Sequence, residues 1–189
     1  MPDGTQFSRE PSTELLTIPN IITFARLCAV PLAVWLTLQH RMEVVFFLFV
    51  AAGLSDAVDG WLARRRGVSA IGAILDPIAD KALLVTMYVT LAAVDILPDW
   101  LAILVVFRDV VIVGGVLVLA VLGQPAQIRP LLISKINTVL QLGLVAVVLM
   151  LAGFHLTAPA PLLLALIWAV AATTLASGAS YVWKAAHTP

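Results

Sequence analysis

Six long apolar segments, separated by short polar connections, take up most of this 189-residue chain. Each is close to the ~20 residues that an α-helix needs to cross ~30 Å of hydrocarbon. A soluble domain of this size has too little interior to bury six such helices. Short connections make neighbouring helices antiparallel. The chain is therefore predicted to be an all-α integral membrane protein, a bundle of six transmembrane helices over 21–39, 43–63, 70–94, 98–122, 133–153 and 160–183.

Composition leads to the same class of protein and excludes others. Apolar residues make up 61% of the chain and charged residues 12%, and the mean hydropathy is +1.05, whereas a soluble domain is about 25% charged. The formal net charge is zero, so no polybasic surface for nucleic acid is expected. The single cysteine, Cys28, allows no internal disulfide and no cysteine-based metal site.

The ends and loops predict how the chain is divided and oriented. Residues 1–17 are polar and lack the basic start and apolar stretch of a secretory signal, so we expect a short cytoplasmic juxtamembrane segment before a six-helix domain over 18–185. Arg64–Arg66 and Arg129 fall in loops on one side, whereas Arg41 stands almost alone on the other. The positive-inside rule places the Arg64–Arg66 loop and both termini in the cytoplasm, in a membrane of the bacterial inner-membrane type.

Four aspartates interrupt the second and third apolar segments: Asp56, Asp59, Asp76 and Asp80. An ionised aspartate at the centre of a membrane helix costs roughly 2.5 to 3.5 kcal/mol, so a cation or water must reach them. The spacings i, i+3 and i, i+4 put each pair on one helix face, and the short loop between the helices allows the pairs to face each other near the cytoplasmic side. Carboxylate oxygens without nearby Cys or His favour Mg²⁺ or Mn²⁺.

The residues around these aspartates indicate the substrate. Arg64 lies one turn beyond Gly60 and suits a phosphate oxygen, while the small Gly60 and Ala63 allow either a ligand or another helix to approach. A carboxylate-held metal beside an arginine at this depth predicts metal-assisted phosphoryl transfer to or from a lipid. Two alternatives are open: ion pairs of the aspartates with Arg64 and Lys81, and a cation transporter, which would distribute its carboxylates through the membrane depth.

The two stretches together resemble a known family. Asp56-Ala-Val-Asp59-Gly60-Trp-Leu-Ala63-Arg64, followed by Gly72-Ala-Ile-Leu-Asp76-Pro-Ile-Ala-Asp80, is similar to the CDP-alcohol phosphatidyltransferase signature D-x2-D-G-x2-A-R-x8-G-x3-D-x3-D. Residues 56–80 are called the signature below. Seven residues instead of eight precede Gly72, a change in a connecting loop where length matters little. The polar N-terminus and six-helix layout also resemble this family.

The resemblance implies a role for each matching residue. Two divalent cations, Mg²⁺ or Mn²⁺, would be held by Asp56, Asp59, Asp76 and Asp80. The CDP group of CDP-diacylglycerol would lie against Asp56, Gly60, Ala63, Arg64 and Gly72. Asp80 would be the catalytic base that takes the proton from the acceptor hydroxyl, which then attacks the β-phosphorus and displaces CMP. The family also implies a homodimer.

The acceptor alcohol is indicated by three further stretches, which also resemble parts of this family. The start of the first helix is similar to members that use either phosphatidylglycerol or glycerol 3-phosphate. Arg108-Asp109 and Ser134-Lys135-Ile136-Asn137-Thr138 are closer to the members that use phosphatidylglycerol, because the others more often carry a second lysine in place of Asn137. Phosphatidylglycerol is therefore the expected acceptor, with glycerol 3-phosphate as the alternative. Candidates for contacting the acceptor, or for supporting the residues that do, are Asn20, Thr23, Arg26, Arg108, Asp109, Lys135 and Asn137.

Simpler roles exist for the charged members of that set. Arg108 and Asp109 would serve equally well in a purely structural contact, and Lys135 in reaching the membrane interface. A phospholipase-D-like mechanism is excluded, because no histidine of the chain is followed two residues later by lysine.

Overall fold

The computed structural model describes the backbone of residues 18–66, 72–121 and 132–186, and the side chains of residues 23–55, 81–115 and 132–181. Within these ranges all regular structure is helical, which confirms the all-α prediction. The helices are α1 Ile18–Leu38, α2 Met42–Arg66, α3 Gly72–Ala93, α4 Asp99–Val121, α5 Leu132–Gly153 and α6 Ala160–Ala186. Each overlaps one of the six predicted segments, and the bounds differ by a few residues.

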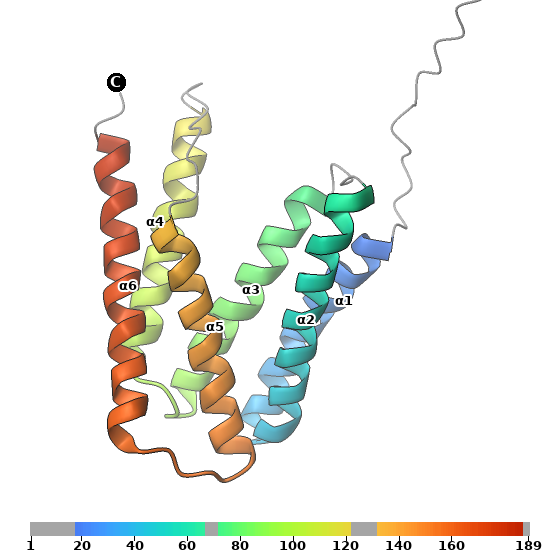
Figure 1. Ribbon diagram of the computed structural model, residues 1–189, viewed down its shortest axis with the longest axis vertical. Helices are drawn as coiled ribbons and strands as arrows, with labels where there is room; N and C mark the ends of the chain where they lie inside the picture. Colours follow the sequence, from blue (N-terminus) through green and yellow to red (C-terminus); the bar gives the residue numbers. More distant parts are fainter. Residues whose placement is uncertain (1–17, 67–71, 122–131, 187–189) are drawn as a thin grey trace, which may run out of the picture.

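Consecutive helices run in opposite directions, as the short connections predict (Figure 1). Helices α2, α4 and α6 end, and α1 and α3 begin, toward the top of Figure 1. This end of the bundle is called the signature end. Helix α1 packs against α2 and α3, α4 against α3 and α6, and α5 against α2 and α6. Each of the six helices thus packs against two others in a closed ring, and α3 also contacts α5 across the ring.

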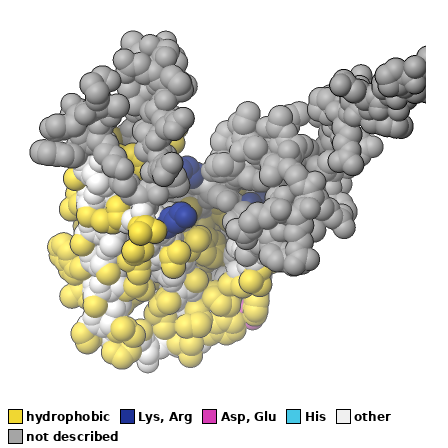
Figure 2. All heavy atoms as spheres, turned by 45° about the horizontal axis from the view of Figure 1, so that its top comes forward, with side chains coloured by type: hydrophobic (Ala, Val, Ile, Leu, Met, Phe, Trp, Pro, Cys, Tyr) yellow, Lys and Arg dark blue, Asp and Glu magenta, His cyan; other side chains and the backbone are white. Residues whose placement is uncertain are grey.

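The described side chains form a dry core below the signature end. Met87, Leu91, Leu101, Val105 and Leu144 are all completely buried, on α3, α4 and α5. Large apolar side chains also cover the outside, as the yellow surface of Figure 2 shows. Phe24 is 67% exposed, Ile103 68% and Val139 67%, a pattern that suits lipid better than water as the surrounding solvent.

Two helices meet a length-and-composition criterion for crossing a membrane within the described residues, Leu132–Gly153 and Ala160–Tyr181. Thr23–Leu38, Met42–Ser55 and Lys81–Ala93, which are the parts of α1, α2 and α3 with described side chains, are shorter apolar stretches. The number of helices is therefore as predicted, and two of the six are identified as candidate spans. The described part of α4 carries Arg108 and Asp109 in its middle, which lowers its hydropathy.

The end opposite the signature is closed by three similar turns. His40, Asp95 and His155 follow α1, α3 and α5, and all three adopt left-handed backbone conformations with φ between 52° and 58°. In each turn the next residue donates its N–H to a carbonyl five residues back at 2.9 Å, from Arg41 to Leu36, from Ile96 to Leu91 and from Leu156 to Leu151. These bonds satisfy carbonyls at the helix ends and reverse the chain within a few residues.

Candidate active site

The backbone places the two halves of the signature at one end of the bundle. Asp56 and Asp59 belong to the second half of α2, and Asp76 and Asp80 to the first half of α3. Only residues 67–71 separate these helices, so both halves lie at the signature end (Figure 1). The following predicted site residues have side chains outside the described residues: Asn20, Asp56, Asp59, Gly60, Ala63, Arg64, Gly72, Asp76 and Asp80. The convergence of the four carboxylates stays a prediction.

The ligands that these helices offer fit a hard divalent cation. Neither α2 nor α3 contains a histidine or a cysteine, so the signature supplies carboxylate oxygens, which Mg²⁺ and Mn²⁺ prefer. Among the residues whose side chains are described, no three His, Cys, Asp or Glu side chains are grouped to hold a metal. The four aspartates remain the candidate ligands.

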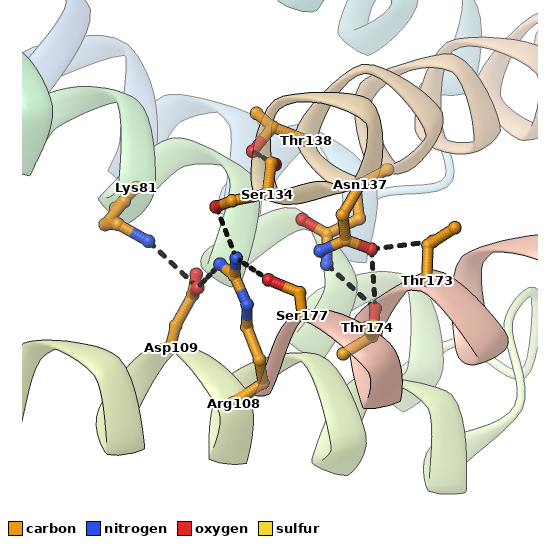
Figure 3. A network of polar contacts seen from close by, with 10 residues as sticks. Lys81, Arg108, Asp109, Ser134, Asn137, Thr138, Thr173, Thr174 and Ser177 are labelled. Carbon is orange, nitrogen blue, oxygen red and sulfur yellow. Dashed lines mark hydrogen bonds and ion pairs between the residues drawn. The ribbon is translucent and has the colours of Figure 1, made fainter. Parts of the chain in front are cut away.

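A partly buried ion-pair cluster includes Lys81, the residue that follows Asp80. Lys81 Nζ on α3 donates to Asp109 Oδ1 on α4 at 2.8 Å, and Arg108 Nη1 donates to the same oxygen at 2.6 Å (Figure 3). Arg108 and Asp109 are 5% and 7% exposed, whereas the Lys81 side chain is 41% exposed. One carboxylate therefore holds two cations, and the three groups together carry a net charge of one positive.

The other end of the same guanidinium reaches two more helices. Arg108 Nη2 donates to Ser134 Oγ on α5 at 2.7 Å and to Ser177 Oγ on α6 at 2.6 Å (Figure 3). Its Nε is buried without a hydrogen-bond partner among the described residues. Arg108 thus joins α4 to α5 and α6, and through Asp109 it is joined to α3. We call Lys81, Asp109, Arg108, Ser134 and Ser177 the four-helix cluster.

Asn137 belongs to a second group of polar contacts one turn further along α5. Its Oδ1 accepts hydrogen bonds from Thr173 Oγ1 and Thr174 Oγ1 on α6, both at 2.9 Å (Figure 3). Gln141 Nε2 also donates to Thr174 Oγ1, at 3.4 Å. Asn137 is completely buried. The side-chain oxygen of Asn137, which was predicted to contact the acceptor alcohol, therefore already accepts two hydrogen bonds from α6.

The remaining predicted acceptor residues with described side chains are Thr23, Arg26 and Lys135. Thr23 and Arg26 on α1 are buried, at 3% and 4% exposed, and each has interaction partners. Lys135 on α5 is exposed. Figure 2, in which the signature end is turned toward the viewer, shows Lys and Arg side chains among apolar ones on this face. The structure thus groups Arg108 with Asp109 and keeps Asn137 in a separate contact.

Sequence reasoning missed the hydroxyl partners on α5 and α6. Ser134 was seen only as part of a family-like stretch, and Thr173, Thr174 and Ser177 were not singled out. On α6, Ser177 follows Thr173 by four residues and Thr174 by three. This spacing puts the three hydroxyls on one helix face and is the only sign of them in the sequence. Serine and threonine are also common wherever membrane helices pack, so that signal has little specificity.

Comparison with known proteins gives the family. The family model for CDP-alcohol phosphatidyltransferase matches residues 16–176, which include the signature and every member of the four-helix cluster except Ser177. A probable cardiolipin synthase (CMP-forming) of Drosophila melanogaster is 34% identical over 203 residues, covering 95% of this chain and 61% of the fly protein.

Other relatives carry a different name. The chloroplastic CDP-diacylglycerol–glycerol-3-phosphate 3-phosphatidyltransferase 1 of Oryza sativa is 33% identical over 184 residues, 88% of this chain and 56% of the rice protein. The Bacillus subtilis protein of the same activity name is 31% identical over 152 residues, 72% of this chain and 78% of its own length. The chain spans less than two thirds of the fly and rice proteins. It belongs to the CDP-alcohol phosphatidyltransferase family.

Proposed function

We propose that this protein transfers a phosphatidyl group from CDP-diacylglycerol to an alcohol and releases CMP. The observation that carries the proposal is the complete signature, divided between the end of α2 and the start of α3 at one end of the bundle. Asp56, Asp59, Asp76 and Asp80 are the proposed ligands of two Mg²⁺ or Mn²⁺ ions, which would neutralise the charge of the diphosphate.

The chain's own residues account for the remaining steps. Arg64 binds the diphosphate, and Gly60, Ala63 and Gly72 give the cytidine nucleotide room against the helices. Asp80 accepts the proton of the acceptor hydroxyl. The hydroxyl oxygen then forms a bond to the β-phosphorus while the bond from that phosphorus to the CMP oxygen breaks. Holding both substrates in line contributes much of the rate.

We propose phosphatidylglycerol as the acceptor, which makes the product cardiolipin. The names of the relatives divide between this reaction and transfer to glycerol 3-phosphate. Two contacts favour phosphatidylglycerol: the Asn137 oxygen is occupied by two threonines, and Asp109 offsets one of the charges of Lys81 and Arg108. A site for a free dianionic phosphate calls for more uncompensated positive charge than the single net positive charge of this region supplies.

The proposed setting is a membrane of the bacterial inner-membrane type, with the signature end and both termini in the cytoplasm and the protein as a homodimer. The basic run Arg64–Arg66 at the end of α2 supports this orientation. A cation transporter is less favoured, because the four aspartates belong to helix halves at one end of the bundle and not to its full depth.

An acceptor assay tests the proposal. Purified protein is given CDP-diacylglycerol and Mg²⁺ with either phosphatidylglycerol or glycerol 3-phosphate, and CMP and the lipid product are measured by mass spectrometry. We expect cardiolipin with the first acceptor, and no product after chelation of the metal. Product from glycerol 3-phosphate alone would overturn the acceptor assignment, and no CMP with either acceptor would overturn the proposed function.

A further inference from the structure

Lys81 is the cation nearest to Asp80 in the chain, yet its ammonium group is engaged elsewhere. On sequence alone it is a natural partner for the signature carboxylates. In the structure its Nζ lies 2.8 Å from Asp109 Oδ1 on α4. Side chains one residue apart on a helix point in different directions, which helps Lys81 to reach α4.

We propose that Asp109 is a positioning residue that keeps the Lys81 ammonium on α4 and so leaves the signature carboxylates available to divalent cations. The inference rests on the proposed role of those carboxylates. It gives Asp109 a task that is distinct from contact with either substrate, and it makes Lys81 a group that would inhibit metal binding if it were released.

The geometry of α3 explains why release would matter. At 1.5 Å of rise per residue, Lys81 is only ~1.5 Å along the helix axis from Asp80 and ~7.5 Å from Asp76. The lysine ammonium is a point charge on a flexible four-carbon stem. Since the Lys81 side chain is 41% exposed, it has room to move once its partner on α4 is gone. A cation in that position would compete with a metal ion for the same oxygens.

The Asp109 carboxylate that holds Lys81 is itself held by Arg108. Arg108 Nη1 lies 2.6 Å from the oxygen that accepts from Lys81, and Arg108 is anchored by Ser134 and Ser177. With Asp109 at 7% and Arg108 at 5% exposed, neither side chain has much freedom. Lys81 is therefore the least buried of the three charged members of the cluster, and its ion pair is with Asp109.

Binding of Mn²⁺ to the purified full chain in lipid nanodiscs, without substrates, tests this by electron paramagnetic resonance. For Asp109→Asn we expect the dissociation constant for Mn²⁺ to rise about tenfold, within the range known for residues that orient metal ligands. Adding Lys81→Met to this variant should return the constant to within about twofold of the wild type, because the competing ammonium is removed. Asp99→Asn, which removes one carboxylate from the opposite end of α4, should change nothing.

The rescue separates this role from simple cross-linking of helices. If Asp109 only joined α3 to α4, the double variant would bind Mn²⁺ no better than Asp109→Asn, and that result would overturn the inference, as would unchanged binding in Asp109→Asn. If Asp109→Asn does not fold, Asp109→Ser keeps an oxygen for Arg108 and makes the same comparison. Wild-type protein that binds no Mn²⁺ would instead contradict the proposed function.

Discussion

Asp80 has two proposed tasks, as a metal ligand and as the base that removes the acceptor proton. A general base alone contributes about 10²- to 10⁴-fold to the rate. We therefore expect Asp80→Asn to lower the kcat of CMP release about 10³-fold or more, because the amide cannot accept the proton. The measurement is CMP formation from CDP-diacylglycerol with saturating Mg²⁺ and phosphatidylglycerol.

Asp95→Asn is a matched control for that change. Asp95 follows the other end of α3 and has a left-handed backbone, with φ 58°, which asparagine also tolerates. The same exchange of carboxylate for amide should leave kcat unchanged there. Full activity in Asp80→Asn would show that the proton is removed by another group.

Arg108 is expected to matter for stability, since its guanidinium is buried and bonded to three side chains. Arg108→Leu leaves Asp109 with Lys81 alone and takes the donor from Ser134 and Ser177. Removing one partner of a buried pair costs about 3 to 5 kcal/mol, so we expect a loss of roughly 3 kcal/mol in the free energy of unfolding. Unfolding by SDS in mixed micelles measures it.

The control is the exposed Arg41 at the opposite end of the bundle. Arg41→Leu should change the free energy of unfolding by no more than about 0.5 kcal/mol. If Arg108→Leu were equally mild, the contacts of the four-helix cluster would contribute little to stability.

Single residues show how far the sequence could lead toward the site. The signature aspartates stand out because charge is rare and costly in apolar helices. The pairing of Lys81 with Asp109 is not evident from the sequence, because the two residues are 28 positions apart and either could pair with several other groups. Ser134 and Ser177 are harder still, since a serine shows its partner only when the helices have been placed beside each other.

At the scale of helices, the closest backbone contact of a described glycine is between the end of α5 and the start of α2. A Cβ atom on Gly153 would lie 2.7 Å from the Glu43 backbone nitrogen and 2.8 Å from its Cα. Because backbone cannot turn aside as a side chain can, Gly153→Ala has to push the two helices apart. We expect it to lower the free energy of unfolding by about 1 to 3 kcal/mol, measured by unfolding in SDS micelles.

Gly143 on the same helix is the matched control. A Cβ there meets nothing within 4 Å, and alanine is the better helix former by up to roughly 1 kcal/mol. Gly143→Ala should therefore leave stability unchanged or raise it. Equal effects of the two substitutions would mean that the approach of α5 to α2 is not tight.

The sequence predicts the helices and their approximate bounds, but not the turns that close them or the faces on which they pack. Six apolar runs separated by polar residues are enough to predict six helices and their antiparallel order. The three closing turns use His40, Asp95 and His155 in a conformation that usually favours glycine. The ends of α1, α3 and α5 therefore lack the glycine that would mark them in the sequence. In helices that are apolar on nearly every side, periodicity cannot indicate which face packs inward, and so it could not predict that Arg108 points at α5 and α6.

For the molecule as a whole, the arrangement separates two kinds of region. Completely buried apolar side chains such as Met87, Leu101 and Leu144 form the core between α3, α4 and α5. Polar contacts are concentrated nearer the signature end, where Arg108 joins α4 to α5 and α6. The apolar core holds the helices together, while the cluster joins α3 to α4 at Lys81, the residue after the proposed metal ligand Asp80. This division supports a bundle whose chemistry takes place at one membrane face.

The cytoplasmic placement of the signature end is a proposal about the whole molecule, and it can be tested directly. The three turns all lie at the end of the bundle opposite the signature end. Labelling a single cysteine introduced at that end therefore reports which membrane face the end occupies. In a Cys28→Ser background, Thr157→Cys places a thiol in the exposed connection between α5 and α6. A membrane-impermeant maleimide should label it in intact cells and right-side-out vesicles, and not in sealed inside-out vesicles. The reverse pattern would put Arg64–Arg66 outside, against the positive-inside rule, and would move the proposed active site to the outer face.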